Sequence, residues 1–372
     1  MPERGRITDA QIAELKDRIG EPIEEPKDRH VTEITPDTIR HWAHGIGCDN
    51  PLYLDAEYAE AGPYNSLIAP PTILSATTRI TSGRPIGLPG VHEMWAGADW
   101  EWHKPIRRGY EIEPSGYLKD IEEKETDFSG RTVVQTYHAD FHNQFGELLA
   151  SADTWGFRTE RDAAAERREK RESVELAHWD EADRQRFIDH YTSEEPRGSE
   201  TRYFEDVSPG DELDTLLKGP LTVTSLIAFN QGWGGAFVDA HRVAYKTFAR
   251  VPDLGIPNDQ GALEPPERVH WDPEYAKSVG AHTAYDYGPE RVAWLGHVAT
   301  HWMGDDGFLR NLYVEVRDHN LLGDVTWCSG EVTDTRIEHG DGLVEVDLEG
   351  RNQRDAVTTA GSATIELPRR SA

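Results

Sequence analysis

One ten-residue motif occurs twice in this chain, more than half its length apart. Residues 50–59 read NPLYLDAEYA and residues 267–276 read ERVHWDPEYA, so Tyr53 falls on His270 and Asp55 on Asp272. The offset is 270 − 53 = 217 residues, whereas solenoid repeats recur about every 20–50 residues. The spacing predicts a duplicated domain. Only the second copy holds a histidine, so we expect acid–base chemistry in one half.

The length and charge of the chain narrow its possible partners. At about 100–200 residues per domain, its 372 residues predict two domains. Lysine and arginine total 39 against 68 acidic residues, a net charge of −29. Such a chain repels phosphate backbones and anionic membranes, which argues against nucleic-acid and membrane partners. We interpret the surplus acid as a solvated surface. A polyanionic substrate such as a coenzyme A ester would need a local basic patch.

Cysteine usage and hydropathy indicate a soluble cytoplasmic protein. Cys48 and Cys328 lie in separate halves, which fits a reducing compartment better than a disulfide framework. No CxxC and no zinc-type His/Cys spacing occurs, so we expect no metal site. The N-terminus has no apolar signal core, and no apolar run reaches the roughly 18 residues of a membrane span.

The expected elements follow one order twice: helices first, then antiparallel strands. That order predicts an α+β protein rather than a doubly wound sheet. We divide the chain into residues 1–158, a charged helical connector at 159–198, and residues 199–372 with an insertion at 236–266. The predicted helices cover 9–19, 35–45, 178–191, 222–230, 236–250 and 289–303, and strands are expected from 94 to 158 and from 312 onward.

At the first motif the chain resembles the MaoC-like dehydratases, or (R)-specific enoyl-CoA hydratases. Their motif reads Asp-x-Asn-Pro-x-His-x-Asp, and residues 48–55 read CDNPLYLD. Residues 67–72, LIAPPT, stand where that family has Ile-Ala-His-Gly-Met. The resemblance extends over residues 10–368 apart from the connector and the insertion. It implies a double hotdog: two fused units, each an antiparallel sheet wrapped around a helix, forming a pseudo-dimer.

The resemblance also implies a mechanism. In the family an Asp and a His activate water for addition to C3 of an enoyl thioester, or reverse that reaction. In the first half, Cys48 stands at the Asp position and Tyr53 at the His position. We therefore expect this half to be catalytically inactive, although it can still help to shape the acyl pocket.

The second half keeps more of the family pattern. His270 stands at the family's histidine, and Tyr287-Gly288 falls where His-Gly opens the central helix. The resemblance therefore assigns His270 to catalysis and the N–H of Gly288, next to Tyr287, to the oxyanion hole. Unpaired N–H groups at a helix start suit a developing enolate oxygen. We expect Asp272 to brace the loop.

The acid partner of His270 is not fixed by the motif. Gly235 stands at the family's Asp position, so a carboxylate from the insertion or beside the motif has to be considered. We favour Asp259 because its turn-forming segment could fold over the pocket. The carboxylates weighed are Asp239, Asp253, Asp259, Glu264 and Glu267.

Three further features have plainer interpretations. We expect the tryptophans Trp95, Trp100, Trp102, Trp294 and Trp302 to fill core and interface positions. His297 and His301 have a metal-capable spacing on one helix, but no third ligand is evident from the sequence. A small basic patch in the insertion, at residues 241–250, could meet a coenzyme A phosphate or be ordinary surface.

Three functions remain open at this point. The first is a cofactor-independent lyase that hydrates or dehydrates an acyl thioester, with a homo-oligomer expected from the resemblance. The second is a hotdog thioesterase, since fold does not fix reaction. The third is a non-catalytic partner subunit of another hotdog protein, because both halves lack the family's acid.

Overall fold

The computed structural model describes residues 5–25, 29–82, 86–88, 91–126, 130–160 and 174–370. Residues 161–173 of the predicted connector therefore lie outside the described residues. Its last part forms α6 (Glu181–Ser193), which begins close to the predicted start at 178. No described helix is long and apolar enough to cross a membrane.

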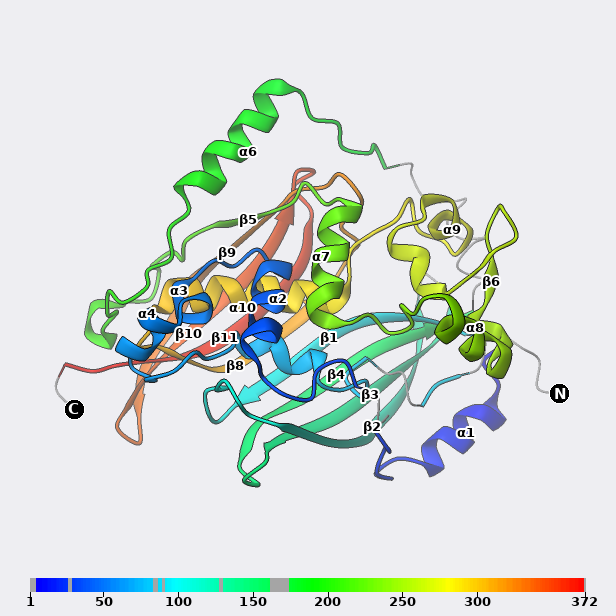
Figure 1. Ribbon diagram of the computed structural model, residues 1–372, viewed down its shortest axis with the longest axis horizontal. Coiled ribbons are helices and arrows are strands. Elements are labelled where there is room, and N and C mark those ends of the chain that lie inside the picture. Colours follow the sequence, from blue (N-terminus) through cyan, green and yellow to red (C-terminus); the bar gives the residue numbers. More distant parts are fainter. Residues whose placement is uncertain are drawn as a thin grey trace.

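A nine-stranded antiparallel sheet forms the frame of the molecule (Figure 1). Its strand order is β2-β3-β4-β1-β8-β11-β10-β9-β5. The strands are β1 (His92–Trp102), β2 (Ile112–Thr126), β3 (Gly130–Asn143), β4 (Leu148–Thr159), β5 (Leu216–Lys218), β8 (Phe308–Val316), β9 (Thr326–Glu338), β10 (Asp341–Asn352) and β11 (Val357–Leu367). The short hairpin of β6 (Ile256–Pro257) and β7 (Leu263–Glu264) stands apart from it.

The two halves of the sheet mirror each other. From the centre outward, the strand order of the first half is β1-β4-β3-β2 and that of the second half is β8-β11-β10-β9. They join through the antiparallel pair β1–β8, in which Asp99 faces Tyr313. The joined sheet confirms the predicted α+β class and the double-hotdog arrangement of two fused units.

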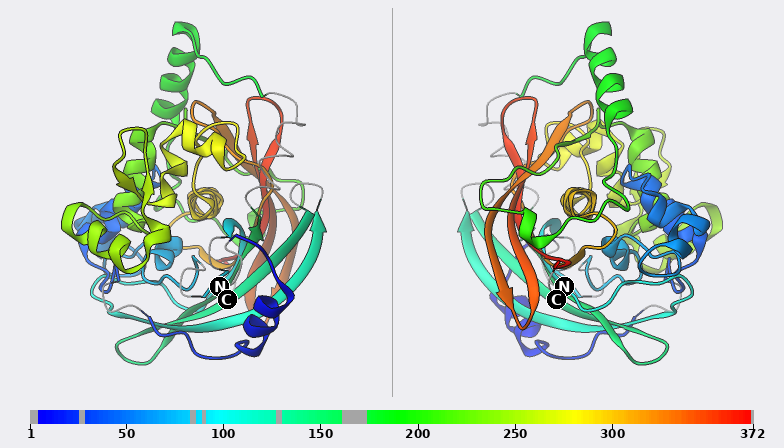
Figure 2. Two further views of the ribbon diagram at one scale, coloured as in Figure 1. Left: turned by 90° about the vertical axis from the view of Figure 1, so that its right-hand side faces the viewer. Right: turned by 90° about the vertical axis from the view of Figure 1, so that its left-hand side faces the viewer.

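The central helices of the two halves differ sharply in length. α10 (Gly288–Met303) is a sixteen-residue helix, and every residue from Glu290 to Met303 is buried. Figure 2 looks along its axis and shows the sheet curving around it. At the equivalent place the first half has η1 (Pro71–Ala76), a six-residue 3-10 helix, and the described residues from there to β1 form no longer helix. The predicted helix at 289–303 is therefore confirmed.

The repeated motif has the same local structure in both halves. Asp55 caps α4 (Ala56–Ala61) by accepting hydrogen bonds from two backbone N–H groups, and Asp272 caps α9 (Pro273–Ser278) by accepting one from Tyr275. In front of these helices lie the single turns α3 (Pro51–Leu54) and η4 (Pro266–His270). The predicted bracing role of Asp272 therefore has a direct structural counterpart.

Helices α2 (Pro36–Gly45) and α7 (Val223–Trp233) pack against each other. Their N-caps, Thr35 and Thr222, accept hydrogen bonds from the backbone three residues on, as expected for Thr at that position. Trp42 and Phe229 meet between them with ring centroids 5.7 Å apart. Both helices confirm the predicted ranges to within a few residues.

Other boundaries needed correction. The helix predicted at 236–250 begins only at His241, as α8 (His241–Arg250). The backbone N–H groups of Ala236 and Phe237 donate hydrogen bonds to the carboxylate of Glu267. These hydrogen bonds hold residues 236 and 237 outside the helix. The first helix is α1 (Asp9–Asp17), two residues shorter than predicted, and β8 begins at Phe308 rather than 312.

Four of the five singled-out tryptophans lie in the core as predicted, namely Trp100, Trp102, Trp294 and Trp302. Trp95 differs, because it is only half-buried and lines a cavity. The short elements η2 (Phe204–Asp206) and η3 (Pro252–Leu254) complete the described helices.

Candidate active site

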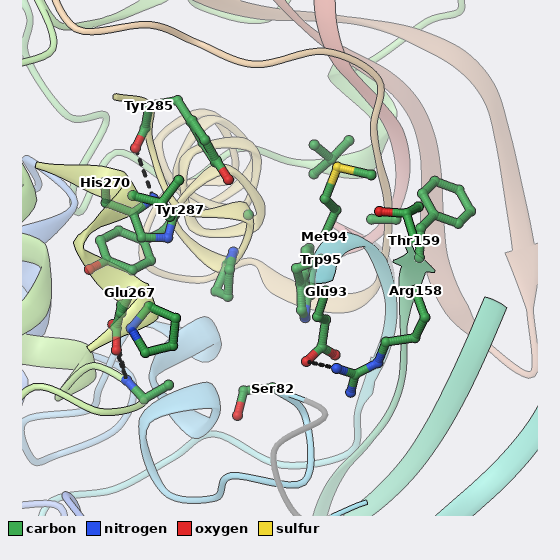
Figure 3. Close-up of a pocket in the computed structure, with 18 of the residues that line it drawn as sticks. Ser82, Glu93, Met94, Trp95, Arg158, Thr159, Glu267, His270, Tyr285 and Tyr287 are labelled. Carbon is green, nitrogen blue, oxygen red and sulfur yellow. Dashed lines mark hydrogen bonds and ion pairs between the residues drawn. The ribbon is translucent and has the colours of Figure 1, made fainter. Parts of the chain in front are cut away.

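A cavity of about 590 Å³ lies between the two halves at the N-terminal end of α10. Figure 3 shows Glu267, His270, Tyr285 and Tyr287 on one side of it. On the other side lie residues of the first half, Glu93, Met94, Trp95, Arg158 and Thr159. The second half thus supplies the polar reactive groups, and the first half supplies a facing wall.

The cavity opens where the described residues of the first half form no counterpart to most of α10. Ile68 of the first half and Tyr285 of the second half each form an isolated β-bridge, and they are 285 − 68 = 217 residues apart. The offset of the repeated motif therefore continues to the start of the central helices. At that offset Gly288 falls on residue 71, where η1 begins, and Met303 falls on residue 86. η1 ends at Ala76, and of the described residues between it and β1, Ser82, Gly87 and Leu88 line the cavity.

His270 is held as a neutral imidazole with a defined tautomer. Its Nδ1 lies 2.8 Å from the carbonyl oxygen of Tyr285, which can only accept, so Nδ1 carries the hydrogen. Nε2 is then the basic nitrogen. The ring stacks on Tyr287 with centroids 3.8 Å apart. Burial lowers the pKa of His270 to about 4, and the nearby His319 acts in the same direction.

Glu267 is a buried carboxyl group in the same cavity. It accepts hydrogen bonds from the N–H of Ala236 at 2.9 Å and of Phe237 at 2.7 Å, and it bonds with the hydroxyl of Tyr287. Burial raises the pKa of Glu267 despite these bonds. A neutral imidazole and a carboxyl with a raised pKa thus share one wall, an arrangement that suits paired base and acid roles.

Tyr287 joins these two groups to the start of α10. Its hydroxyl accepts a hydrogen bond from Asn230 at 2.7 Å and also meets Glu267. Burial raises the pKa of Tyr287 well above its usual value, so it stays protonated at neutral pH. Tyr287 therefore fixes the imidazole by stacking and the carboxyl by hydrogen bonding.

The N-terminus of α10 faces the cavity at Gly288. A side chain there would collide with Trp95, since a Cβ would lie 2.5 Å from the indole ring. Pro289 follows and has no N–H. The N–H of Gly288 is one of the donors that a helix start leaves without an intrahelical partner. It is thus placed to stabilise a developing negative charge in the cavity.

Two ion pairs frame the cavity, one of them partly and the other fully buried. Glu93 and Arg158 of the first half pair at 2.9 Å, and Arg158 also donates to Gln135 at 2.6 Å. In the second half Arg291 pairs with Asp286, which lies directly before the Tyr287-Gly288 turn. The remaining wall is largely apolar, formed by Leu88, Val91, Met94, Ala96, Phe157, Trp233, Leu254, Val269 and Val316.

The other predicted carboxylates lie away from the reactive wall. Asp259 is exposed in the β6–β7 turn and is not among the described residues that line the cavity. Asp239 is exposed ahead of α8, and Glu264 accepts a hydrogen bond from Asn258 at 2.6 Å. Asp253 lines the cavity from η3 with an exposed side chain. The structure thus brings Glu267, and not Asp259, beside His270.

In the first half the corresponding position is filled. Tyr53 is buried and hydrogen-bonds Thr300 of α10. Cys48 is also buried, and burial raises the pKa of its thiol to about 11. The hydroxyl of Tyr58 donates to Asp305 at 2.6 Å, just past the C-terminal end of α10. No described residue of this motif lines the large cavity.

The structure supplies the third group that the His297 and His301 pair lacked in the sequence. Glu194, at the end of α6, brings a carboxylate oxygen within 4.8 Å of nitrogen atoms of both histidines. The amino group of Lys218 already lies 2.8 Å from Nδ1 of His297. These residues could ligate a metal ion, although the lysine places a competing positive charge beside them.

Several site residues were not found from the sequence. Glu93, Arg158 and Trp233 come from separate strands and helices, and no local motif marks them. Tyr285 and Asp286 are the two residues directly before the recognised Tyr287-Gly288 turn. Charged residues within an apolar strand were the available signal for Arg158, because a buried charge needs a partner.

Comparison with known proteins places the fold. Residues 18–152 match the family described as "FAS1-like, dehydratase domain region". A solved MaoC-like dehydratase superposes with a TM-score of 0.66 and 18% identity, covering 95% of this chain and 100% of that chain. A conserved hypothetical protein of Mycobacterium tuberculosis, described as a double hotdog, gives 0.51 and 9% over 93% and 96%. The chain thus has the double-hotdog fold of MaoC-like dehydratases.

Curated relatives cover about a third of the chain. A UPF0336 protein of Streptomyces avermitilis is 28% identical over 127 residues, 33% of this chain and 81% of that protein. A probable enoyl-CoA hydratase alpha subunit of Thermomonospora curvata is 25% identical over 151 residues, 36% of this chain and 47% of that protein. The family and structure matches, together with the enoyl-CoA hydratase subunit, confirm the resemblance to MaoC-like dehydratases.

Proposed function

We propose that this protein is a hydro-lyase that adds water to, or removes it from, the C2–C3 bond of an acyl thioester. The observation that carries the proposal is the neutral imidazole of His270, which lies in one cavity with the carboxyl of Glu267 and the N-terminus of α10. The family match supports hydratase or dehydratase chemistry in general. The assignment of thioester, residues and roles is our proposal.

In the hydration direction His270 acts as the base. The hydrogen bond from Nδ1 to Tyr285 leaves Nε2 to take a proton from water while the water oxygen bonds to C3. The pKa of about 4 keeps the imidazole neutral at physiological pH. Negative charge moving onto the substrate then raises the basicity of the imidazole as the reaction proceeds.

The electron pair of the C2–C3 double bond moves toward the thioester oxygen as water adds. The N–H of Gly288 donates to that oxygen, aided by the partial positive charge of the α10 start. When the enolate collapses, C2 takes a proton from the carboxyl of Glu267, whose raised pKa favours the protonated form. The proton taken up by His270 returns to Glu267 through solvent, so the net reaction adds one water.

The wall from the first half suits an acyl chain. Met94, Trp95 and Phe157 give it an apolar surface, and burial of such surface is worth about 25 cal/mol per Å². The cavity of about 590 Å³ falls within the range of small-molecule sites. We propose a thioester carried on a phosphopantetheine-type group, which leaves the acyl part free to enter.

The test is an assay with purified protein and a 2-enoyl thioester. Hydration removes the conjugation between C=C and thioester, so the ultraviolet absorbance of the conjugated system should fall without release of free thiol. Thiol release instead would identify a thioesterase. If there is neither absorbance loss nor thiol release, and activity appears only with a co-expressed homologue, the protein is a partner subunit and the proposal fails.

A further inference from the structure

We propose that the exposed face of α8 docks an acidic carrier protein that delivers the acyl group as a thioester on a phosphopantetheine arm. The inference rests on the proposed function, because that proposal identifies the delivered group as an acyl thioester. Its own evidence is the charge, exposure and position of α8, and its test measures binding rather than turnover.

α8 is the one segment of the insertion that concentrates positive charge. Its sequence, HRVAYKTFAR, contains no acidic residue in a chain with a net charge of −29. Arg242, Lys246 and Arg250 are spaced four apart and all exposed, so they form one stripe along the helix. At 1.5 Å per residue the stripe is about 12 Å long.

These cations have no ion-pair partner within the described part of the chain. The other long exposed helix shows the contrast. On α6, Arg184 pairs with Glu181 and Arg186 with Asp183, each within the same helix. An uncompensated stripe on a strongly acidic protein attracts an anionic partner and repels a second copy of this chain.

The position of α8 ties it to the cavity. Ala236 and Phe237 line the cavity before the helix, and Asp253 and Leu254 line it directly after. α8 is therefore anchored at both ends on the cavity wall and packs inward through Phe248. Figure 1 shows it grouped with α9 and β6 at the end of the molecule that holds the second motif.

Exposed apolar side chains accompany the cations. Val243 is 59% and Tyr245 is 52% exposed on α8, and Val238 and Val251 are exposed at its two ends. A nucleotide phosphate requires converging cations, whereas a linear stripe with apolar neighbours fits an extended protein surface. Aromatic side chains and arginine are enriched at such interfaces. The geometry therefore favours a carrier protein over free coenzyme A.

The binding experiment uses the full chain and the holo acyl carrier proteins of the source organism. Wild type should bind one of them, and R242E/K246E/R250E should weaken that binding by more than about tenfold, as should added salt. Lys246→Glu alone should also weaken binding, and its matched control Arg108→Glu, which reverses another exposed cation, should bind as wild type does. Each variant's melting temperature verifies that it is folded.

Two outcomes would overturn the inference. One is binding that is absent or unaffected by the triple reversal. The other is equal competition by coenzyme A with the same dependence on the stripe, which would assign α8 to the phosphate rather than to the protein. A kinetic comparison separates this result from the proposed function, because an N-acetylcysteamine thioester carries no phosphate. The kcat/KM for this thioester should differ by less than about twofold between the triple variant and wild type.

Discussion

The two ends of α10 hold the two copies of one motif in opposite states. Near its C-terminal end, the buried Tyr53 hydrogen-bonds Thr300 of the helix, and Cys48 is buried as well. At its N-terminal end, His270 and Glu267 face a cavity of about 590 Å³. Figure 1 shows α3 and α4 near one end of the helix and α9 near the other.

The difference comes from helix length as much as from the motif residues. The C-terminal turns of α10 occupy the position beside the first motif. In the first half η1 ends after six residues, and the described residues between it and β1 form no helix that could fill the position beside the second motif. The two halves thus differ in the length of their central helices, while their strands still form one continuous sheet.

The largest expected effect contrasts His270 with its counterpart Tyr53. His270→Ala should lower kcat/KM for thioester hydration by about a thousandfold, since general-base catalysis is worth about 10²–10⁴-fold. Tyr53→Phe should leave activity within twofold, because that side chain does not reach the cavity. Steady-state kinetics on both variants provide the measurement. Comparable losses in the two would mean that the halves do not differ as described.

The second contrast sets Glu267 against Asp259. Glu267→Gln should lower kcat by about a hundredfold because the amide cannot deliver a proton to C2. Asp259→Asn changes an exposed carboxylate of the insertion and should have no measurable effect. The ratio of kcat between the two variants decides the assignment. A reversed ratio would return the acid role to the β6–β7 turn.

The third prediction concerns the open end of α10. Gly288→Ala should lower kcat roughly tenfold, because its Cβ would meet Trp95 at 2.5 Å and displace the helix start. Gly296→Ala, in the middle of the same helix, would place its Cβ 3.1 Å from the methyl group of Thr72 and 3.4 Å from Leu312 and should retain most activity. Thermal melts of both variants separate lost stability from lost catalysis, and equal kcat values would refute the role of the helix start.

The smallest expected effect is on stability against pH. The pKa of His270 is lowered to about 4 in the folded protein, against about 6.5 when unfolded. The unfolded state therefore binds the proton first, and stability falls as pH drops from 6.5 toward 4. His270→Gln removes this term, so its melting temperature should fall roughly 1–3 °C less than that of wild type between pH 7 and pH 5.

Tyr53→Phe is the control for that measurement and should follow wild type, since Tyr53 does not titrate in this range. Equal pH dependence in wild type and His270→Gln would contradict the buried, neutral imidazole. The same protonation should lower kcat/KM as pH approaches 4, because the base is then occupied.

Sequence reasoning succeeded where the signal was local. Thr35 and Pro36 identified the start of α2, and the apolar run before Met303 identified α10. It was less accurate where the structure depends on contacts between residues that are far apart in the sequence. The helix expected from residue 236 was shortened because Glu267, thirty residues later, binds the N–H groups of Ala236 and Phe237.

The residues of the candidate site show the same difference between local and long-range signals. His270 and Gly288 stand in recognisable motifs, so the sequence could point to them. Glu267 was considered but ranked behind Asp259, because turn propensity says nothing about which carboxylate is buried. Arg158 and Glu93 come from the opposite half and carry no motif.

By itself the sequence determined the duplication, the helix caps and the half that holds the histidine, because each depends on side chains within a few residues of one another. Tertiary structure decided that the cavity exists, which carboxylate shares it and which strands form its far wall. These depend on a shortened helix in one half facing a motif in the other, and on burial that shifts the pKa of His270 and Glu267 in opposite directions.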